Sequence, residues 1–384
     1  MRIRAAVLRH PSRPVEVEEV ELDEPKAREV LVRVAAVGVC HSDVRHADGD
    51  LGPGKWPAVM GHEGAGVVEA VGEGVTHVVP GDPVALCFVP ACRSCRYCVS
   101  GKPNLCEVVA EHGARGMLMD GTSRLRLLDG TTLQHGLRTA CFAELTVVAA
   151  GGAVRIPSEL PLWQAALLGC GVVTAMGAVR NVARVQPGDS VAVLGCGGVG
   201  LQVIGAARLA GADPIIALDR VPEKLELARA LGATHTVDGA AVADPVDAIS
   251  RLSGGGVDYA FEIIGRPETI RSAWDAIRPG GTAVVVGLVP DGVEATVPAV
   301  EFLSDKSLVG TYYGSGDPAL ELPGLAELAL AGEIDLRGVV THVDGLDGVE
   351  AALDRLRRGE GARTVLIVDD ALAGYTERDA LHRH

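Results

Sequence analysis

The chain has 384 residues, of which 48 % are hydrophobic, and this length and composition allow two domains that each bury a core. Its 35 basic and 50 acidic residues give a formal net charge of −15, which disfavours nucleic acid and anionic membranes as partners. The first residues lack the apolar region of a secretory signal. The longest apolar stretch, around 162–173, is shorter than the ~18 to 20 residues that span a bilayer. We therefore expect a cytoplasmic protein.

The first third of the chain predicts a small β-rich domain, because alternating or continuously apolar runs such as 15–22 and 29–39 lie between Pro, Asp and Glu breaks. From about Leu162 the apolar period becomes helical, and from 191 to 314 strands alternate with helices. This alternation predicts a doubly wound parallel sheet. Residues 371–384 show no apolar periodicity, and we expect them to be loosely held.

Four of the nine cysteines lie within the stretch CRSCRYCVSGKPNLC. They are Cys92, Cys95, Cys98 and Cys106, in C-x2-C-x2-C-x7-C order. A long chain without a secretory signal is an unfavourable setting for disulfides, whereas four thiolates on one short loop can surround a zinc ion tetrahedrally. The spacing predicts a structural zinc site.

A dinucleotide-binding loop is predicted where Gly195, Gly197 and Gly200 form a G-x-G-x-x-G pattern after an apolar strand and at the start of a helix. Such glycines permit a tight turn, a close approach of a diphosphate and close helix packing. Nineteen residues after Gly200, the strand PIIALD ends at Asp219, whose carboxylate would bind a ribose and repel a 2′-phosphate. NAD is therefore favoured over NADP, a preference that Arg220 could soften.

A second metal site is predicted from residues far apart in the sequence. Cys40, His62 and Cys170 are each ambiguous alone, because isolated cysteines and histidines are common in protein cores. Together they form the three-ligand set that leaves zinc a fourth position for water or substrate. Zinc in such a site lowers the pKa of an alcohol and so favours loss of hydride to a nicotinamide. Asp43 is a candidate partner for the second ring nitrogen of His62.

Taken in order, the segments GVCHSD, GHEGAG, CRSCRYCVSGKPNLC, GCGVVTAMGAV, GCGGVG, DYAFEIIGRPET and GARTVLI resemble the zinc-dependent medium-chain alcohol dehydrogenases, of the liver-type and class III-like branch, over nearly the whole chain. The resemblance implies an α/β protein with a GroES-like β-rich catalytic domain, residues 1–171 and 313–384, that carries a structural zinc lobe at about 92–106. A Rossmann domain, residues 172–312, would bind NAD(H). Two zinc ions per chain, one catalytic and one structural, are implied.

The resemblance also implies roles for individual residues. Cys40, His62 and Cys170 would hold the catalytic zinc, Glu63 would be a nearby carboxylate that can also bind this zinc, and Ser42 would take the proton of the substrate. The implied cofactor-binding positions are His41, Gly195, Gly197, Gly198, Val199, Gly200, Asp219, Arg220, Lys224, Val286 and Arg363. His41 and Arg363 stand where basic groups meet the pyrophosphate. The implied substrate walls are Leu51, Phe88, Gly136, Leu137, Leu288 and Tyr312.

The chain departs from the liver-type members at several positions. Arg45 replaces a histidine that passes the proton to solvent, and arginine cannot act as a base, so His46, a water chain or another path would carry that proton. Gly136 replaces a bulkier residue, which suggests room for a larger, aromatic or terpenoid alcohol. The long segment 107–145 resembles that of dimeric members, so a homodimer is expected, with a homotetramer as the alternative.

We expect NAD-dependent oxidation of a primary or secondary alcohol to an aldehyde or ketone. A thiol-dependent formaldehyde dehydrogenase is the alternative; its glutathione type is disfavoured because Leu51 and Ala110 stand where that type carries charges, while a mycothiol type stays open. A non-catalytic NAD-binding or interaction protein is disfavoured by the joint presence of Cys40, Ser42 and His62 with Cys170. The acidic charge disfavours a zinc-finger nucleic-acid binder.

Overall fold

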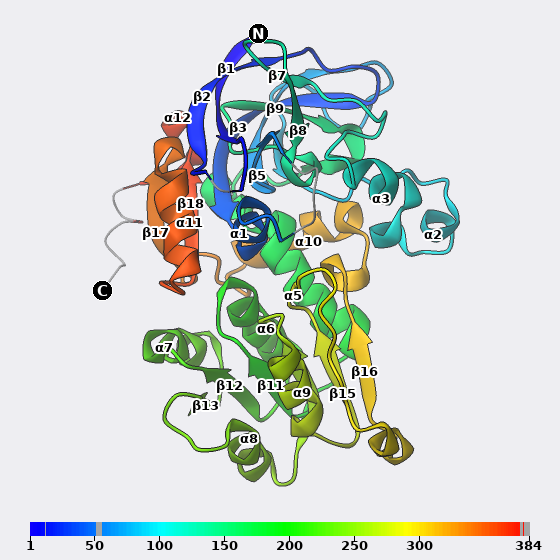
Figure 1. Ribbon diagram of the computed structural model, residues 1–384, viewed down its shortest axis with the longest axis vertical. Coiled ribbons are helices and arrows are strands. Elements are labelled where there is room, and N and C mark those ends of the chain that lie inside the picture. Colours follow the sequence, from blue (N-terminus) through cyan, green and yellow to red (C-terminus); the bar gives the residue numbers. More distant parts are fainter. Residues whose placement is uncertain (12, 51–55, 377–378, 380–384) are drawn as a thin grey trace. The chain divides into compact units, whose positions relative to one another are not determined.

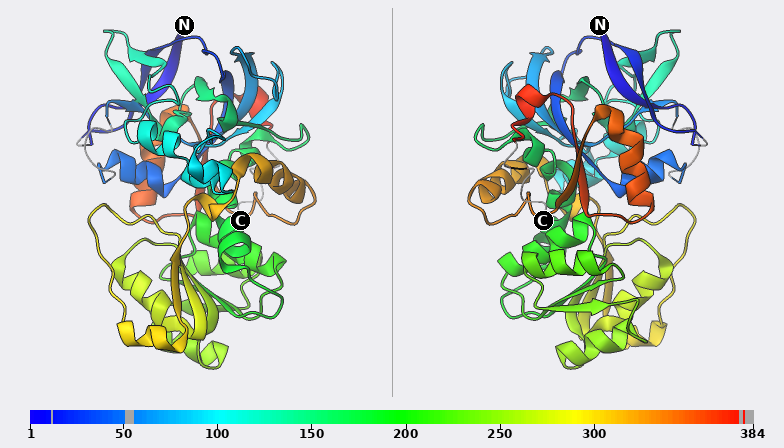
Figure 2. Two further views of the ribbon diagram at one scale, coloured as in Figure 1. Left: turned by 90° about the vertical axis from the view of Figure 1, so that its right-hand side faces the viewer. Right: turned by 90° about the vertical axis from the view of Figure 1, so that its left-hand side faces the viewer.

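The computed structural model describes residues 1–11, 13–50, 56–376 and 379, shown in Figures 1 and 2. The chain forms two compact units, which are described separately. Unit 1 comprises Met1–Gly171, Gly316–Gly332 and Val340–His384, and unit 2 comprises Val172–Ser315 and Glu333–Val339.

The expected second domain boundary, after residue 312, was wrong. Residues 313–315 belong to unit 2, because the side-chain amide of Asn181 donates a hydrogen bond to the carbonyl of Gly314 at 3.0 Å and Tyr313 is buried. Residues 333–339 also belong to unit 2, where the apolar side chains of Ile334, Leu336 and Val339 are buried. Because packing between distant residues sets this boundary, no local pattern in the sequence predicts it.

Unit 1 contains a closed barrel and a seven-stranded sheet. The barrel order is β1 (Arg2–Leu8), β2 (Glu16–Leu22), β7 (Leu125–Leu127), β8 (Thr132–His135) and β4 (Ala58–Val59). The sheet order is β10 (Ala153–Arg155), β6 (Pro83–Leu86), β5 (Glu63–Val71), β3 (Glu29–Val39), β18 (Arg363–Ile367) and β17 (Val340–Gly345), with β9 (Leu145–Ala149) also paired to β3. The sequence EVLVRVAAVGV of β3 is buried except at Arg33, which explains its near-continuous apolar run at the centre of the sheet.

Most helices of unit 1 are short. They are α1 (His41–Ala47), α2 (Arg96–Val99), η1 (Pro103–Leu105), α3 (Glu107–Gly113), η2 (Gly136–Arg138), η3 (Ala150–Gly152), α4 (Leu162–Ala165), α10 (Pro318–Leu330), η8 (Leu346–Gly348), α11 (Val349–Arg357) and α12 (Asp370–Ala373). The π-helical turn η4 (Leu168–Val172) continues α4. The expectation that residues 371–384 are loosely held was wrong for part of this segment: residues 370–373 form α12, and Ala373 is fully buried. Residues 377–378 and 380–384 lie outside the described part.

Unit 2 has the predicted doubly wound sheet. Six parallel strands follow the order β13 (His235–Asp238), β12 (Ile215–Asp219), β11 (Val191–Leu194), β14 (Val257–Glu262), β15 (Ile277–Val285) and β16 (Ser307–Gly310). The helical elements are α5 (Val173–Gly177), η5 (Ala178–Ala183), α6 (Gly198–Leu209), α7 (Pro222–Leu231), α8 (Pro245–Ser253), α9 (Pro267–Ala276), η6 (Ala299–Ser304) and η7 (Tyr313–Ser315). In chain order the strands run 3-2-1-4-5-6, the arrangement of a Rossmann domain (Figure 1), and the expected α/β class is confirmed.

The stretch Leu162–Ala183 forms one helix of 22 residues, longer than the apolar run expected from the sequence. By length and composition it could cross a membrane, but 89 % of its apolar window is buried inside the protein. Burial among other protein segments explains its apolar character, since core helices are apolar all round.

A buried charged cluster holds the loop before β7 in unit 1. The guanidinium of Arg124, only 1 % exposed, donates to both carboxylate oxygens of Glu29, at 2.8 and 2.5 Å, and to Asp120 at 2.7 Å. The backbone N–H of Arg124 donates to Nε2 of His135, which is fully buried. Burial, with the neighbouring Arg124 charge as a smaller cause, lowers the pKa of His135 to about 3. The imidazole is therefore neutral in the native protein.

This imidazole should make the protein sensitive to mild acid. An unfolded histidine binds a proton below pH ~6.5 and native His135 does not until about pH 3, so stability falls as the pH drops through this window. At ~1.4 kcal/mol per pH unit, the loss between pH 6.5 and pH 5 is about 2 kcal/mol. We expect His135→Asn, whose amide oxygen can still accept the Arg124 N–H, to reduce this loss in urea unfolding at pH 7.5 and pH 5. Parallel pH profiles for both proteins would contradict the prediction.

Candidate active site

The pairing of β3 with β5 brings two predicted metal ligands together. In this antiparallel pair Gly38 lies opposite Glu63, so Cys40, just after β3, and His62, just before β5, emerge at the same end. Cys170 reaches them from the turn η4. The ligand atoms of Cys40, His62, Glu63 and Cys170 all lie within 4.8 Å of one another, and all four residues are buried.

Asp43 fixes the orientation of His62. One carboxylate oxygen of Asp43 lies 3.0 Å from Nδ1 of His62, and the other accepts the backbone N–H of Cys40 at 3.0 Å. This contact places the ring proton on Nδ1 and leaves Nε2 as the lone-pair nitrogen. Nε2 is buried and has no hydrogen-bond partner among the described residues.

The residues at this site fit a zinc ion with one open position. Two thiols and an unpaired imidazole nitrogen form the donor set of a catalytic zinc site. The pKa of Cys40 lies well below its ordinary value, because Cys170 hydrogen-bonds to its sulfur and His62 lies beside it. A thiolate, the form that binds metals, is thus favoured at Cys40.

Glu63 and Arg363 form a buried ion pair beside the three ligands. The carboxylate of Glu63 is 0 % exposed and lies 3.1 Å from the guanidinium of Arg363, which is 5 % exposed. Burial raises the pKa of Glu63 to about 7, and Arg363 opposes that shift. A side chain at Gly171 would overlap the guanidinium, and one at Gly38 would overlap the carboxylate, so both glycines are required by this pair. Arg363 is therefore buried beside the metal ligands.

The residues predicted for proton transfer lie on or next to α1. The hydroxyl of Ser42 is 3.2 Å from the sulfur of Cys40. Arg45 is held by Asp50 in an ion pair of 2.6 Å, and His46 is buried. His41, the first residue of α1, is exposed.

Among the residues predicted to line the substrate, Phe88 contacts one of the predicted metal ligands. Its ring meets the imidazole of His62 edge-on, with centroids 5.4 Å apart.

Position 136 is a glycine for a different reason from the one expected: a Cβ at this position would lie 2.6 Å from the carbonyl oxygen of Val59. The missing side chain is thus explained by close backbone packing rather than by room for substrate. The remaining wall residues are Leu137 in η2, the half-exposed Leu288 and Tyr312 in unit 2, and Leu51, which lies outside the described residues.

Sequence reasoning missed Arg138. Its Nε donates to the carbonyl oxygen of Phe88 at 2.7 Å, and its guanidinium lies 5.9 Å from the centroid of the Phe88 ring. A side chain at Gly113 in α3 would overlap this guanidinium, so α3 packs closely against it. Arg138 has a φ of 66°, a conformation rare for arginine, so no local sequence signal marked its position.

The four cysteines of the predicted zinc lobe lie together. Their sulfur atoms are within 4.8 Å of one another, and all four cysteines are free thiols. Although partial burial opposes it, hydrogen bonds from Ser94 and Cys95 lower the pKa of Cys92 to about 6. Arg93 on this loop pairs with Asp317, which also caps the start of α10 by accepting the N–H of Ala319. The thiols fit a closed structural zinc site, and the arginine ties their loop to α10.

The glycine loop of unit 2 has the geometry that a dinucleotide requires. Gly195 has a φ of 102°, which favours glycine, and a side chain at Gly200 would overlap the carbonyl oxygen of Gly195. A Cβ at Gly197, the N-cap of α6, would meet none of the described atoms within 4 Å, so this side of the loop is open. An anion here would face the N-terminus of α6, which begins with Gly198 and Val199.

Asp219 closes the same loop. One of its carboxylate oxygens accepts the N–H of Cys196 at 2.7 Å, and the other accepts the N–H groups of Arg220 and Val221 at 2.7 and 3.0 Å. The oxygen that accepts only the N–H of Cys196 keeps a further acceptor site for a ribose hydroxyl. Arg220 is exposed, Lys224 lies in the first turn of α7, and Val286 follows β15 directly.

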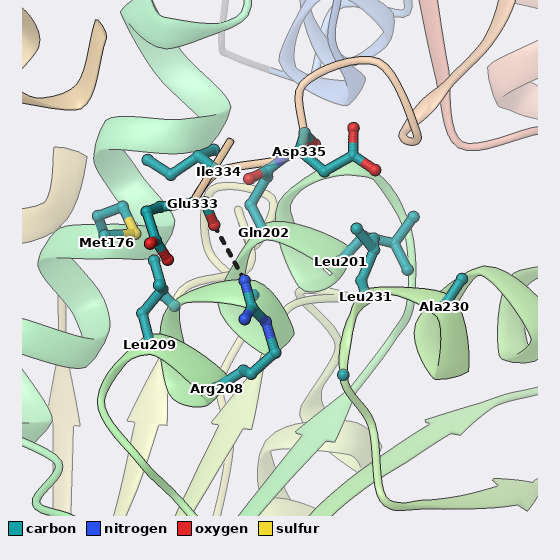
Figure 3. A pocket seen from close by; sticks show the side chains of 13 residues that line it. Met176, Leu201, Gln202, Arg208, Leu209, Ala230, Leu231, Glu333, Ile334 and Asp335 are labelled. Atoms are coloured by element: carbon teal, nitrogen blue, oxygen red, sulfur yellow. Dashed lines mark hydrogen bonds between the residues drawn. The ribbon is translucent and has the colours of Figure 1, made fainter. Parts of the chain in front are cut away.

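A separate cavity of about 230 Å³ lies in unit 2 between α6, the end of α7 and residues 333–335 (Figure 3). Figure 3 shows the guanidinium of Arg208 donating to the carbonyl of Glu333, at 3.0 Å. None of its lining residues belongs to the predicted site.

Comparison with known proteins identifies two family patterns. Residues 26–158 match the family described as "Alcohol dehydrogenase GroES-like domain", and residues 198–331 match "Zinc-binding dehydrogenase". The two matches cover the β-rich part and most of the Rossmann part of the chain.

Full-length relatives agree with these matches. A protein of Escherichia coli O1:K1 / APEC named S-(hydroxymethyl)glutathione dehydrogenase is 41 % identical over 368 residues, which cover 95 % of this chain and 100 % of that protein. The crystal structure of benzyl alcohol dehydrogenase from Acinetobacter calcoaceticus is similar with a TM-score of 0.90, at 32 % identity over 96 % of this chain and 100 % of that one. A structure titled "Alcohol dehydrogenase zinc-binding domain protein", from Burkholderia ambifaria, has a TM-score of 0.91 at 37 % identity, covering 96 % and 99 % of the two chains.

These similarities extend over 95 % or more of the chain. The chain therefore belongs to the zinc-dependent alcohol dehydrogenases of the medium-chain superfamily and is an NAD-dependent oxidoreductase with zinc as its metal.

Proposed function

We propose that this enzyme oxidises an alcohol with an apolar body directly to its aldehyde or ketone, without a thiol carrier. The observation that supports the proposal is the buried set of Cys40, His62 and Cys170, in which the imidazole of His62 has an unpaired nitrogen and its ring contacts the aromatic ring of Phe88. An apolar wall next to a metal position suits a hydrocarbon group attached to a hydroxyl.

The residues of the chain have separate parts in this reaction. Cys40, His62 and Cys170 would hold zinc, which when bound acts as a Lewis acid toward the alcohol oxygen. Asp43 keeps His62 in the tautomer that leaves Nε2 free. The hydroxyl of Ser42 takes the proton of the alcohol, and Phe88 excludes water from the reacting carbon. The proton leaves by His46, a water chain or another path, since Arg45 is paired with Asp50 and stays charged.

A thiol-dependent formaldehyde dehydrogenase is the second candidate. It is favoured by the Escherichia coli relatives, which are named S-(hydroxymethyl)glutathione dehydrogenase. Against the glutathione type, Ala110 on α3 is exposed and offers no charge to a glutathione carboxylate. A thiol with a neutral sugar group does not need such a charge.

A substrate panel tests the two candidates. We expect NADH to form from plain alcohols, followed at about 340 nm, with kcat/KM for benzyl-type alcohols about tenfold to a hundredfold above that for ethanol, because burial of the extra apolar body stabilises the transition state. Phe88→Ala should reduce this preference more than Phe88→Leu, which keeps an apolar wall. Turnover that requires both formaldehyde and a low-molecular-weight thiol would instead establish the second candidate.

The two cysteine sites should be separable. We expect Cys170→Ala to lower kcat by more than about 100-fold, because it removes a metal ligand, and to leave the zinc of the Cys92–Cys106 loop bound. Cys98→Ala should mainly lower the Tm, because the second zinc holds a loop. Cys141→Ala, at a buried thiol outside both clusters, is the control that should retain both ions. Zinc content, Tm and kcat measured together check this; loss of activity without loss of stability in both zinc-site variants would contradict it.

We also propose that the enzyme is a cytoplasmic homodimer and that unit 2 carries the contact between the two copies. Val300 and Leu303 in η6 are 72 % and 87 % exposed, and Phe302 beside them is half exposed. This apolar patch precedes β16, which lies at the edge of the sheet and has no partner on its outer side among the described strands. An open strand edge next to exposed apolar side chains suits pairing with a second copy.

Light scattering after size exclusion measures this contact. We expect a dimer mass for the native protein and a shift toward monomer for Leu303→Lys, because a lysine cannot be buried unpaired in an interface. Leu320→Lys is the matched control, since Leu320 in α10 is 76 % exposed but lies in unit 1. An unchanged mass for Leu303→Lys would exclude this patch as the contact.

A further inference from the structure

The segment Val368–Thr376, here called the C-terminal strap, is fixed to the centre of the sheet in unit 1. The backbone N–H groups of Val368 and Asp369 both donate to the carbonyl oxygen of Ala35, at 2.9 and 3.1 Å. Ala35 lies where the register of β3 against β5 shifts, so its carbonyl is free for these bonds. The strap therefore continues from β18 with defined hydrogen bonds.

The helix α12 within the strap is capped at both ends. The carboxylate of Asp369 accepts the N–H groups of Ala371 and Leu372, at 3.0 and 3.3 Å. Gly374 ends the helix with a φ of 68° and lies against Pro161, the N-cap of α4. Caps of this kind replace hydrogen bonds that such a short helix lacks.

An aromatic contact joins the strap to α4. The ring of Tyr375 meets the indole of Trp163 edge-on, with centroids 5.5 Å apart. Trp163 is 1 % exposed, and its indole N–H has no hydrogen-bond partner among the described residues. Packing alone therefore holds this tryptophan, and Tyr375 supplies part of that packing.

The strap touches all three elements that carry the zinc ligands. The helix α12 packs against β3, β5 and α4. Cys40 follows β3, His62 precedes β5, and Cys170 follows α4 on the same continuous helix as Trp163. Cys170 comes seven positions after Trp163, or about 10 Å along the helix axis. A contact on Trp163 thus acts on the element that delivers the third ligand.

We propose that the C-terminal strap positions Cys170 for zinc, and that Tyr375 is the positioning residue that acts through Trp163. The ligands come from three separate elements, so their sulfur and nitrogen atoms meet only while those elements stay packed. Groups outside the ligand set commonly tune how firmly a metal is held. The strap does this by covering the start of α4 while it is bonded to β3.

Zinc release from the full-length holoenzyme to a colorimetric chelator tests this inference. The native protein should show two release phases, one for each zinc. Cys170→Ala keeps only the structural zinc, so the single phase of this variant identifies the release rate of the structural site. We expect Tyr375→Ala to speed release of the other zinc about tenfold, the lower end of what losing an outer partner of a metal site costs. The structural phase should keep its rate.

Matched variants distinguish positioning from general loosening. Tyr375→Phe keeps the ring that packs on Trp163 and should release this zinc far more slowly than Tyr375→Ala, and Tyr375→Leu, which keeps apolar volume, should give an intermediate rate. Leu128→Ala removes an apolar side chain of unit 1 that is 49 % exposed and lies outside both zinc sites and the strap, and it should change neither rate. Equal acceleration of both phases, or no acceleration, in Tyr375→Ala would overturn the proposal. The measurement needs no alcohol, so it stands apart from the test of the proposed function.

Discussion

The active-site residues depend on the register between β3 and β5. Because Gly38 faces Glu63 in this pair, the residues just beyond the two strand ends, Cys40 and His62, share one edge of the sheet. A shift of one residue would turn every side chain of a strand to its opposite face. The burial of β3 on both faces resists such a shift, since it would exchange packed side chains for others of different volume. The core of unit 1 and its metal ligands are therefore specified by the same pairing.

The register of β3 against β5 also places a carboxylate in the core. Glu63 begins β5 and is fully buried beside two thiols, where an uncompensated negative charge would be costly. Arg363 begins β18 and reaches this carboxylate, and the pairing of β18 with β3 places it there. Its guanidinium leaves no room for a side chain at Gly171, next to the ligand Cys170. A glycine beside a metal ligand is thus a consequence of charge compensation elsewhere in the site.

The sequence predicted those features whose residues are local or have characteristic spacing. The cysteine loop, the glycine fingerprint and the alternation of strands with helices are of this kind. The contact of Asp43 with His62 was also predicted, although these two residues are distant in the sequence. Features that arise from packing between distant segments were missed or misjudged. Gly136 was assigned to substrate room although backbone contact explains it, Arg138 occupies a rare conformation, and the residues after Asp370 pack on Trp163 without any apolar period of their own. In each case the partner lies far away in the chain.

The two zinc sites differ in the same way, because the ligands of one are close together in the sequence and the ligands of the other are far apart. The thiols of residues 92–106 lie on one short loop, so closing a ring around a metal costs little chain entropy, and the loop can bind zinc before the rest of the chain is packed. The loop between Cys40 and Cys170 is longer than the loop between Cys92 and Cys106 by about three doublings in length. At ~0.6 kcal/mol per doubling, closing the longer loop costs about 2 kcal/mol more in chain entropy. The packing of the folded sheet must offset this entropic cost, and metal binding alone does not. The catalytic set therefore requires tertiary contacts that the structural set does not, and the segment that begins at Val368 provides them on the elements that hold Cys40, His62 and Cys170.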